Sequence, residues 1–235
     1  TYRIDRTGAI VSQRSASAAP ARLAAGLLRR AIADGASLYS KVEALEVLAD
    51  PDGVTLMTDA GFAVRAKRVI FCCGYEFPKA VPTPGADVIS TWALATKPRT
   101  PCPTWLKHML VWEASDPYLY FRMGGDGRLI VGGEDEADPL AHDDQARLKR
   151  KCETIAAKLK RLMPQLAFEI DYSWAGAFGE SATGLPSIGP VEGMDHCWAV
   201  MGFGGNGITY SVIASQIVAA EVRGGSDPDA GLYRG

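Results

Sequence analysis

The 235-residue sequence lacks long hydrophobic runs, an excess of one charge, and paired metal-binding motifs. Its hydrophobic residues make up 47% of the chain, but no uninterrupted run approaches the ~20 residues that a membrane-spanning helix needs. The formal net charge is −2, and Lys and Arg are spread along the chain, which argues against a nucleic-acid-binding surface. These features predict a soluble protein with a substantial hydrophobic core and no nucleic-acid partner.

Cysteine and histidine are too few and too scattered to predict a metal site or a disulfide framework. The five cysteines are odd in number and show no Cys-x-x-Cys spacing, and the three histidines lie far apart. We therefore expect reduced, mostly buried thiols in a cytoplasmic protein without a metal. The sequence begins at Thr1 with no targeting segment, so we also expect the chain to start inside a longer gene product.

The most informative feature is a glycine-dense run at residues 202–207, Gly-Phe-Gly-Gly-Asn-Gly. The apolar residues 197–201 precede it as a predicted strand, and apolar residues at helical spacing follow it to Val222. Glycine allows a bound molecule to approach bare backbone, and the first turn of a helix carries unsatisfied N–H donors that attract negative charge. This strand, turn and helix predict a binding site for a large cofactor; an ordinary tight loop before a packing helix is the alternative.

The first part of the sequence predicts one helix and several short strands. Proline at position 20, periodic leucines and a closing Gly35 are typical of a helix. Residues 69–73 form an unbroken apolar run ending at Gly74, which predicts a strand buried on both faces of a parallel sheet. Between them, turn residues separate short extended segments at 37–40, 42–48, 54–58 and 62–66.

The middle of the sequence predicts a second lobe. Proline is dense between Pro78 and Pro103, which marks the crossing from one lobe to the other. Beyond it, strands are predicted at 109–112, 117–123 and 128–133, with a hairpin turn at 124–127. A helix capped by Asp143 or Asp144 should run to about Leu162, and residues 170–178 should form another strand.

Four motifs occur in an order that resembles the D-amino acid oxidase family of flavin-dependent oxidoreductases, which includes glycine and sarcosine oxidases. Each motif is weak alone, but together they cover nearly the whole chain. They are Pro20-x-x-Leu23 leading through Gly35-Ala36 to Val42, the segment 58–61 before 69–74, the segment 126–133, and the segment 184–189 before the terminal glycine turn.

The resemblance implies a mixed α/β fold, with part of a Rossmann-like FAD-binding lobe and a substrate lobe built on a large, mostly antiparallel sheet flanked by helices. Residues 1–84 would belong to the FAD-binding lobe, residues 85–180 to the substrate lobe, and residues 181–235 would return to the first. It also implies an enzyme that uses FAD to oxidise a small-molecule amine or amino acid by hydride transfer.

The family's N-terminal Gly-x-Gly-x-x-Gly dinucleotide fingerprint, which places the FAD pyrophosphate on a helix start, is absent from this sequence. We therefore expect a C-terminal portion whose partner is a missing N-terminal segment or a companion subunit. The alternative is a non-catalytic fragment, or a subunit of a split flavoprotein, that binds no cofactor alone. Thr183 also stands where family members usually carry an aspartate, so this position keeps a hydroxyl for turn hydrogen bonding but loses the charge.

The resemblance also assigns cofactor-binding positions. It implies that backbone groups in the C-terminal glycine turn hydrogen-bond the pyrimidine edge of the flavin. It matches Val42 to the position that meets adenine, and Cys73 and Gly74 to the turn near the ribose and pyrophosphate. A plain core strand for Val42 and a strand terminator at Gly74 are the alternatives. The turn residues so assigned are Gly204, Gly205, Asn206, Gly207 and Ile208.

One predicted strand carries candidate substrate-binding residues. Tyr118, Tyr120 and Arg122 alternate along it, so their side chains should share one face while Leu119 and Phe121 occupy the other. In the family such strands wall the substrate cavity, which implies that Arg122 grips a substrate carboxylate with support from the two tyrosines. A solvent-facing sheet surface is the alternative.

Overall fold

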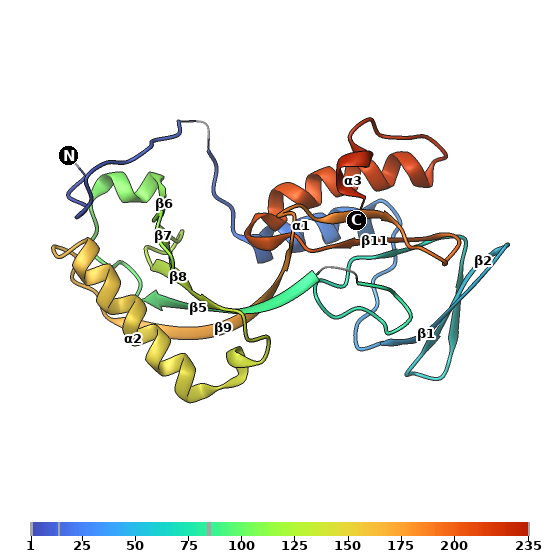
Figure 1. The fold of residues 1–235 in the computed structure, drawn as a ribbon, viewed down its shortest axis with the longest axis horizontal. Coiled ribbons are helices and arrows are strands. Elements are labelled where there is room, and N and C mark those ends of the chain that lie inside the picture. The colour runs from blue at the N-terminus through green and yellow to red at the C-terminus, as the bar shows by residue number, and fades with distance from the viewer. Residues whose placement is uncertain (1, 14, 84–85, 235) are drawn as a thin grey trace. The chain divides into compact units, whose positions relative to one another are not determined.

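The structure is a computed structural model that describes residues 2–13, 15–83 and 86–234. The chain forms two compact units, and Figure 1 shows their elements. Unit 1 comprises Thr1–Ser17 and Val88–Ala177, and unit 2 comprises Ala18–Asp87 and Phe178–Gly235. The chain passes from one unit to the other after Ser17, Asp87 and Ala177, and Thr1–Ser17 groups with the unit that contains the middle of the chain.

Unit 1 is built on a five-stranded sheet with one long helix packed against one face. The strand order is β6-β7-β8-β5-β9, and the β6–β7, β7–β8 and β8–β5 pairs are antiparallel. Trp92 and Phe121 of the sheet share one core cluster with Ile155 of the helix α2, and all three are fully buried. The elements are β5 (Ala86–Thr96), η1 (Thr104–His108), β6 (Leu110–Trp112), β7 (Leu119–Met123), β8 (Leu129–Glu136), η2 (Ala141–Asp143), α2 (Gln145–Leu162) and β9 (Ile170–Ser181).

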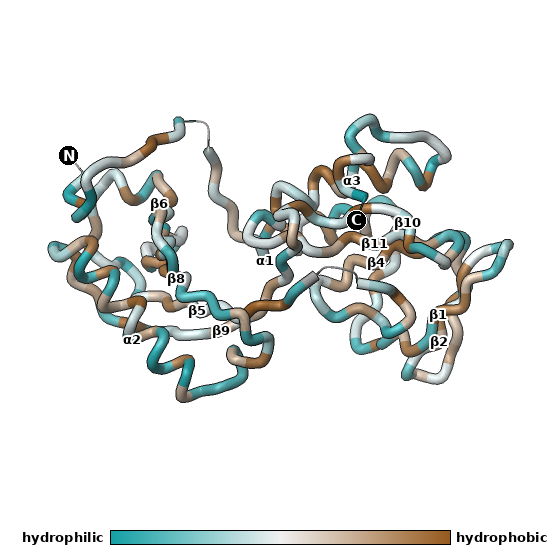
Figure 2. The backbone as a smooth tube through the Cα atoms, in the orientation of Figure 1, coloured by the Kyte–Doolittle hydropathy of each residue, from teal (hydrophilic) through white to brown (hydrophobic). Residues whose placement is uncertain are grey.

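Unit 2 contains two three-stranded sheets, ordered β1-β2-β3 and β10-β11-β4. In the second sheet β11 is parallel to β4 and antiparallel to β10. Helix α3 packs on this sheet through Ala214, Ile217 and Val218, and its hydrophobic positions appear brown in Figure 2. The elements are α1 (Pro20–Ala33), β1 (Ala44–Asp50), β2 (Gly53–Thr58), β3 (Ala63–Ala66), β4 (Val69–Phe71), β10 (Ser187–Pro190), β11 (Cys197–Met201), η3 (Gly204–Asn206), α3 (Gly207–Val222) and η4 (Ala230–Tyr233).

Most predicted elements are confirmed with ends shifted by a few residues, but the prediction missed β5. Its sequence is rich in β-branched and aromatic residues, and the surrounding prolines obscured that signal. The extended segment predicted at 37–40 is wrong, because these residues are exposed and pair with no strand among the described residues.

The prediction for residues 69–73 is also partly wrong. A strand forms only over Val69–Phe71, Ile70 is 44% exposed, and Cys72 and Cys73 are exposed. Within the described chain β4 is the last strand of its sheet, so no strand pairs with its second edge. The expectation of mostly buried thiols is also wrong, because only Cys152 and Cys197 of the five cysteines are buried.

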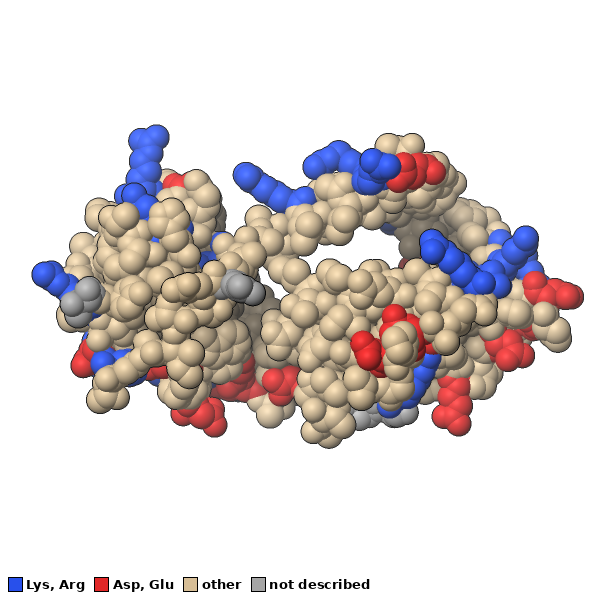
Figure 3. Space-filling model, turned by 90° about the horizontal axis from the view of Figure 1, so that it is seen from above, with Lys and Arg blue, Asp and Glu red and all other residues tan. Residues whose placement is uncertain are grey.

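Two surface properties bear on function. In the part of the chain that the structure describes, no helix combines the length and the apolar sequence needed to cross a membrane. On the face drawn in Figure 3, basic and acidic side chains are scattered among neutral ones. This face therefore carries no broad basic surface of the kind that follows a nucleic-acid backbone.

Candidate functional site

Two glycine-containing turns in unit 2 meet at one edge of a sheet. Val69 pairs with Cys197 and Phe71 with Ala199 in the parallel register of β4 and β11. Both strands therefore end side by side, and the chain continues from β4 into Cys73 and Gly74 and from β11 into Gly202. Ligands of open α/β sheets bind outside the carboxyl ends of parallel strands, so this edge is the candidate cofactor site of unit 2.

The turn after β11 leaves bare backbone exposed in front of α3. Gly202 has φ 74° and Gly204 has φ 53°, a left-handed conformation that glycine adopts without strain. A side chain added at Gly204 would meet nothing within 4 Å, so the space before this residue is open. The short helix η3 then leads directly into α3 at Gly207.

The first turn of α3 has no side-chain cap. Asn206 occupies the N-cap position, but its side chain makes no capping hydrogen bond, and Asn206, Ile208 and Thr209 are exposed. The N–H groups of a first helical turn have no partner within the helix, and the helix dipole adds partial positive charge there. Because Ile217 and Val218 anchor α3 on the sheet, these donors are held in a fixed direction at the carboxyl edge.

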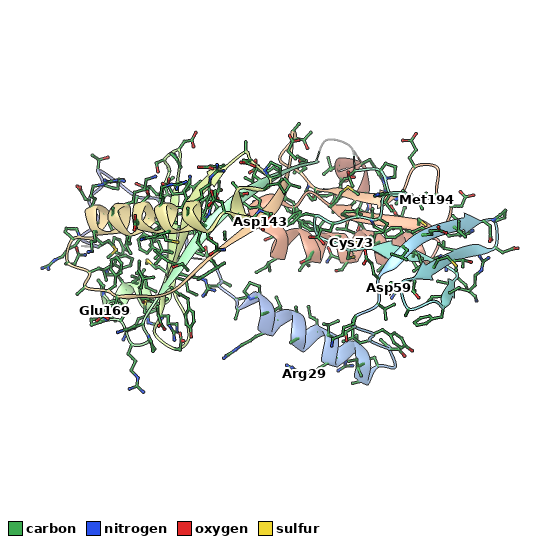
Figure 4. All side chains as sticks on the ribbon, turned by 90° about the horizontal axis from the view of Figure 1, so that it is seen from below. Arg29, Asp59, Cys73, Asp143, Glu169 and Met194 are labelled. Atoms are coloured by element: carbon green, nitrogen blue, oxygen red, sulfur yellow. The ribbon has the colours of Figure 1, made fainter. Side chains whose placement is uncertain are left out.

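The predicted residues Cys73 and Gly74 belong to this same edge. Gly74 has φ 66° and open space around it, so the turn after β4 can also receive a close-lying ligand. Partial burial of the sulfur raises the pKa of Cys73, and the neighbouring Cys72 adds to this shift, so the thiol stays protonated at neutral pH. Cys73 is labelled in Figure 4.

Val42 is placed differently from the other predicted cofactor residues. It is 39% exposed and precedes β1, the first strand of the sheet formed by β1, β2 and β3. No described hydrogen bond or strand pairing joins it to the turns after β4 and β11. The interpretation of Val42 as plain strand core is wrong, because the residue is exposed and precedes the strand.

The candidate substrate residues of unit 1 share one face of their sheet, as the alternation predicts. Leu119 and Phe121 are fully buried against the α2 side, and Tyr118, Tyr120 and Arg122 are half-buried on the other side. Tyr118 lies just before β7 rather than within it.

Two further residues on this face were missed by sequence reasoning. Trp112 pairs directly with Tyr120 across β6 and β7, and its ring stacks on both tyrosines. Asp135 accepts a hydrogen bond of 2.5 Å from the hydroxyl of Tyr118. The pairing of Trp112 could be anticipated from the β6–β7 hairpin, but the position of Asp135 depends on an irregularity in β8 that has no clear sequence signal.

Tyr120 and Arg122 on this face have different electrostatic neighbours. Burial raises the pKa of Tyr120, and the negative charge of Asp135 raises it further while Arg122 opposes the shift. Among the described residues no carboxylate lies within salt-bridge distance of Arg122, whose guanidinium makes only a long 3.5 Å contact to the carbonyl of Met123. Arg122 is therefore available to bind an anion.

The carboxyl edge of parallel strands, the glycine turn and the uncapped helix start together place unpaired backbone N–H donors beside open space, the geometry of a candidate site for an anionic or large cofactor. The model of the DAO family, described as FAD dependent oxidoreductase, matches residues 3–221. The chain belongs to this family, whose members depend on FAD, and the four sequence motifs above correctly indicated it.

Individual relatives are distant and longer than this chain. The chain is 28% identical to a probable oxidoreductase, OrdL, of Rhizobium meliloti over 85% of its own length and 46% of the relative's. It is 29% identical to gamma-glutamylputrescine oxidoreductase of Escherichia coli over 46% of this chain and 24% of that protein. The chain thus spans less than half the length of these curated relatives.

A solved structure shows the same fold. Glycine oxidase from Geobacillus kaustophilus superimposes with a TM-score of 0.76 at 21% sequence identity, over 90% of this chain and 56% of that one. At this identity the similarity establishes the fold alone. The predicted mixed α/β fold, with helices on antiparallel sheets, is confirmed.

Proposed function

We propose that this chain forms part of an FAD-dependent oxidoreductase that oxidises an amine or amino acid by hydride transfer to the flavin. The observation that carries the proposal is the exposed, uncapped start of α3 at the carboxyl edge shared by β4 and β11. The free thiols, none of them in a disulfide among the described residues, fit the predicted cytoplasmic location.

The backbone of unit 2 fits part of such a cofactor. The open space at Gly204 admits a flat ring, and the amides of Gly205, Asn206, Gly207 and Ile208 would hydrogen-bond its pyrimidine edge. When bound, FAD accepts two electrons and a proton as a hydride. The positive end of α3 would stabilise the negative charge that this transfer brings to the ring.

The turn at Cys73 and Gly74 would face the ribose and pyrophosphate, and Val42 would meet the adenine. The Gly-x-Gly-x-x-Gly spacing at residues 202–207 is assigned here to the flavin ring, and no such loop precedes it among the described residues, so another polypeptide segment would supply the remaining pyrophosphate contacts. This segment would lie upstream in the same gene product or in a companion subunit.

The substrate would be recognised on the face of unit 1 that α2 does not cover. Arg122 has no carboxylate partner within the described ranges and would bind a substrate carboxylate through two parallel hydrogen bonds, with Tyr120 and Tyr118 beside it. The substrate carbon would lose a hydride while its nitrogen lone pair forms the C=N bond, and water would hydrolyse the resulting imine. The names of the relatives, glycine oxidase and gamma-glutamylputrescine oxidoreductase, support an amine or amino acid.

The test uses the protein expressed from its complete gene and purified with FAD. We expect anaerobic addition of primary and secondary amines or amino acids to bleach the visible flavin absorbance. A flavin that remains oxidised with every amine and amino acid tried would refute the proposal.

A second candidate is a chain that binds no cofactor alone and acts through its companion segment. Two observations favour it. Helix α1 has no buried residue although it carries four leucine or isoleucine side chains that are each at least 42% exposed, and β4 has an unpaired edge in the described structure. Arg29 in Figure 4 marks this helix.

Absorbance spectra separate the two candidates. Under the second candidate, the 235-residue chain should be colourless after it has been purified alone, incubated with FAD and dialysed to remove unbound flavin. A yellow chain with flavin bound in stoichiometric amount would exclude it.

A further inference from the structure

The face of unit 1 that carries Arg122 also holds a layer of three aromatic rings. The ring centroids of Trp112 and Tyr118 lie 4.7 Å apart at 21°, those of Trp112 and Tyr120 lie 5.8 Å apart at 29°, and those of Tyr118 and Tyr120 lie 6.2 Å apart. Trp112 thus lies across both tyrosines. It is 56% exposed, so much of the indole is open to a ligand.

The glycines of β8 hold these rings in place. Tyr120 pairs with Gly132 and Leu119 with Gly133. A side chain at Gly132 would overlap the ring of Tyr120, and one at Gly133 would collide with the carbonyl of Tyr118. The tyrosine ring therefore rests on bare backbone, and the aromatic layer is organised before any ligand arrives.

Asp135 is the carboxylate of this strand with no basic side chain within salt-bridge distance in the described part of the chain. Glu134 has φ 64°, and this irregularity in the strand backbone turns the side chains of Glu134 and Glu136 toward the Lys and Arg side chains of α2. Lys151 and Lys158 pair with Glu134, and Lys151 and Arg147 pair with Glu136. Asp135 instead accepts from Tyr118, and its Oδ1 is buried with no hydrogen-bond partner among the described residues.

A buried carboxylate without a positive partner is costly, and a nearby cation reduces that cost. Aromatic faces attract cations as well, tryptophan most strongly. The hydrogen bond from Tyr118 to Asp135 leaves its ring electron-rich, so the carboxylate and the π faces favour the same kind of ligand.

We propose that Trp112, Tyr118, Tyr120 and Asp135 form a binding site for the organic ammonium end of the substrate. This inference rests on the proposed function, because it names the substrate class of the same face. Arg122 lies two residues beyond Tyr120 and four beyond Tyr118, roughly 7 Å and 13 Å along an extended strand. The substrate is thus an elongated molecule with an anionic group near Arg122 and a positively charged nitrogen at the far end of the aromatic layer, where Tyr118 contacts Trp112 and Asp135.

The test is a calorimetric titration that needs no flavin turnover. Choline supplies a quaternary ammonium, and 3,3-dimethyl-1-butanol supplies the same shape without the charge. We expect the full chain to bind choline at least tenfold more tightly than the neutral alcohol. Equal affinities, or no binding of choline, would overturn the proposal.

Variants locate the site. Trp112→Leu and Asp135→Asn should each weaken choline binding about tenfold, and Trp112→Phe should recover part of the loss. Trp174→Leu is the matched control, because Trp174 is an exposed tryptophan on β9, at the opposite edge of the same sheet. Circular dichroism and thermal unfolding confirm that each variant is folded.

Two results would contradict the assignment. One is an equal loss of choline binding in Trp112→Leu and Trp174→Leu. The other is binding of a lysine-rich peptide by the aromatic layer without binding of choline, which would indicate a protein-docking surface. Failure of every amine to bleach the flavin would refute the proposed function and leave the choline titration unaffected, so the two failures are distinguishable.

Discussion

Arg122 shows how a single charged residue can be assigned a role from its surroundings. Strand alternation places it beside Tyr120 and away from the core residues Leu119 and Phe121. Its guanidinium has no carboxylate partner among the described residues, in contrast to Arg128, which pairs with Asp126 and Asp171. The proposal that Arg122 binds an anion, whereas Arg128 stabilises the fold, rests on this difference.

Replacing Arg122 by Leu in the protein expressed from its complete gene should raise KM for carboxylate substrates at least tenfold. Uncharged amines should be affected far less, because they make no bidentate contact with the guanidinium. Arg122→Lys should restore only part of the affinity. Steady-state kinetics with matched substrate pairs checks this, and an equal rise in KM for both substrate types would remove the assignment.

Gly132 is the residue on which the aromatic layer depends. A methyl group in Gly132→Ala would overlap the ring of Tyr120, so the ring must move and the sheet is expected to lose about 1–3 kcal/mol of stability. Gly125→Ala is the control, because nothing lies within 4 Å of the added carbon. Urea unfolding and choline titration of both variants test this. Unchanged choline binding in Gly132→Ala would show that Tyr120 is not needed.

At the scale of elements, local sequence signals and tertiary packing agree for α2 and diverge for β4. Helix α2 begins after Asp144, whose side chain accepts from the backbone N–H groups of Ala146 and Arg147, as its position before the periodic residues predicts. Strand β4 has an equally clear apolar sequence but is short and half-exposed, because burial depends on neighbours that its own residues cannot specify.

Asp144→Ala should lower the melting temperature by about 2–6 °C through loss of the helix cap. The hydrogen bond from the N–H of Arg147 lowers the pKa of Asp144 below its ordinary value of 3.8. The cap therefore stabilises the fold fully above pH 3.8 and loses its effect as the pH falls through the lowered pKa. Thermal unfolding against pH measures this, with Glu153→Ala as an exposed control on the same helix. A difference that persists in strong acid would contradict the capping role.

The role of the turn between β11 and α3 in flavin binding can be tested by a substitution that strains its backbone. Valine at Gly204 would be strained at φ 53° and would fill the open space before α3. We expect Gly204→Val to lose most of its flavin, measured as the ratio of visible to protein absorbance. Gly193→Val is the matched control, because Gly193 also has positive φ and open space but lies between β10 and β11. Equal flavin loss in both variants would indicate general destabilisation.

At the scale of the whole molecule, the question is what covers the apolar face of α1. The helix has no buried residue, and Leu28 and Ile32 lie one turn apart with exposed fractions of 47% and 48%. A helix with such a stripe normally packs against another element. The missing dinucleotide fingerprint and the length of the relatives agree with a further segment that completes unit 2.

The double variant Leu28→Glu, Ile32→Glu should leave the stability of the 235-residue chain within about 0.5 kcal/mol of the parent, because both side chains are already exposed. In the protein expressed from its complete gene it should destabilise by several kcal/mol, on the order of the cost of burying a charge. Denaturant unfolding of both forms checks this. Leu140→Glu, at a 70% exposed position of unit 1, is the control. Equal effects in the two forms would show that nothing covers α1.

The sequence by itself determined the family, the three long helices, most strands and the alternation that places Tyr118, Tyr120 and Arg122 on one face. These properties depend on local periodicity, capping and turn residues, which are carried by neighbours in the chain. Only the tertiary structure decided the rest: the shared edge of β4 and β11, the stacking of Trp112, the exposed state of α1, and the position of Asp135. Each of these depends on strand register and on burial by residues distant in sequence. Neither the register nor the burial of a segment can be deduced from the residues of that segment alone.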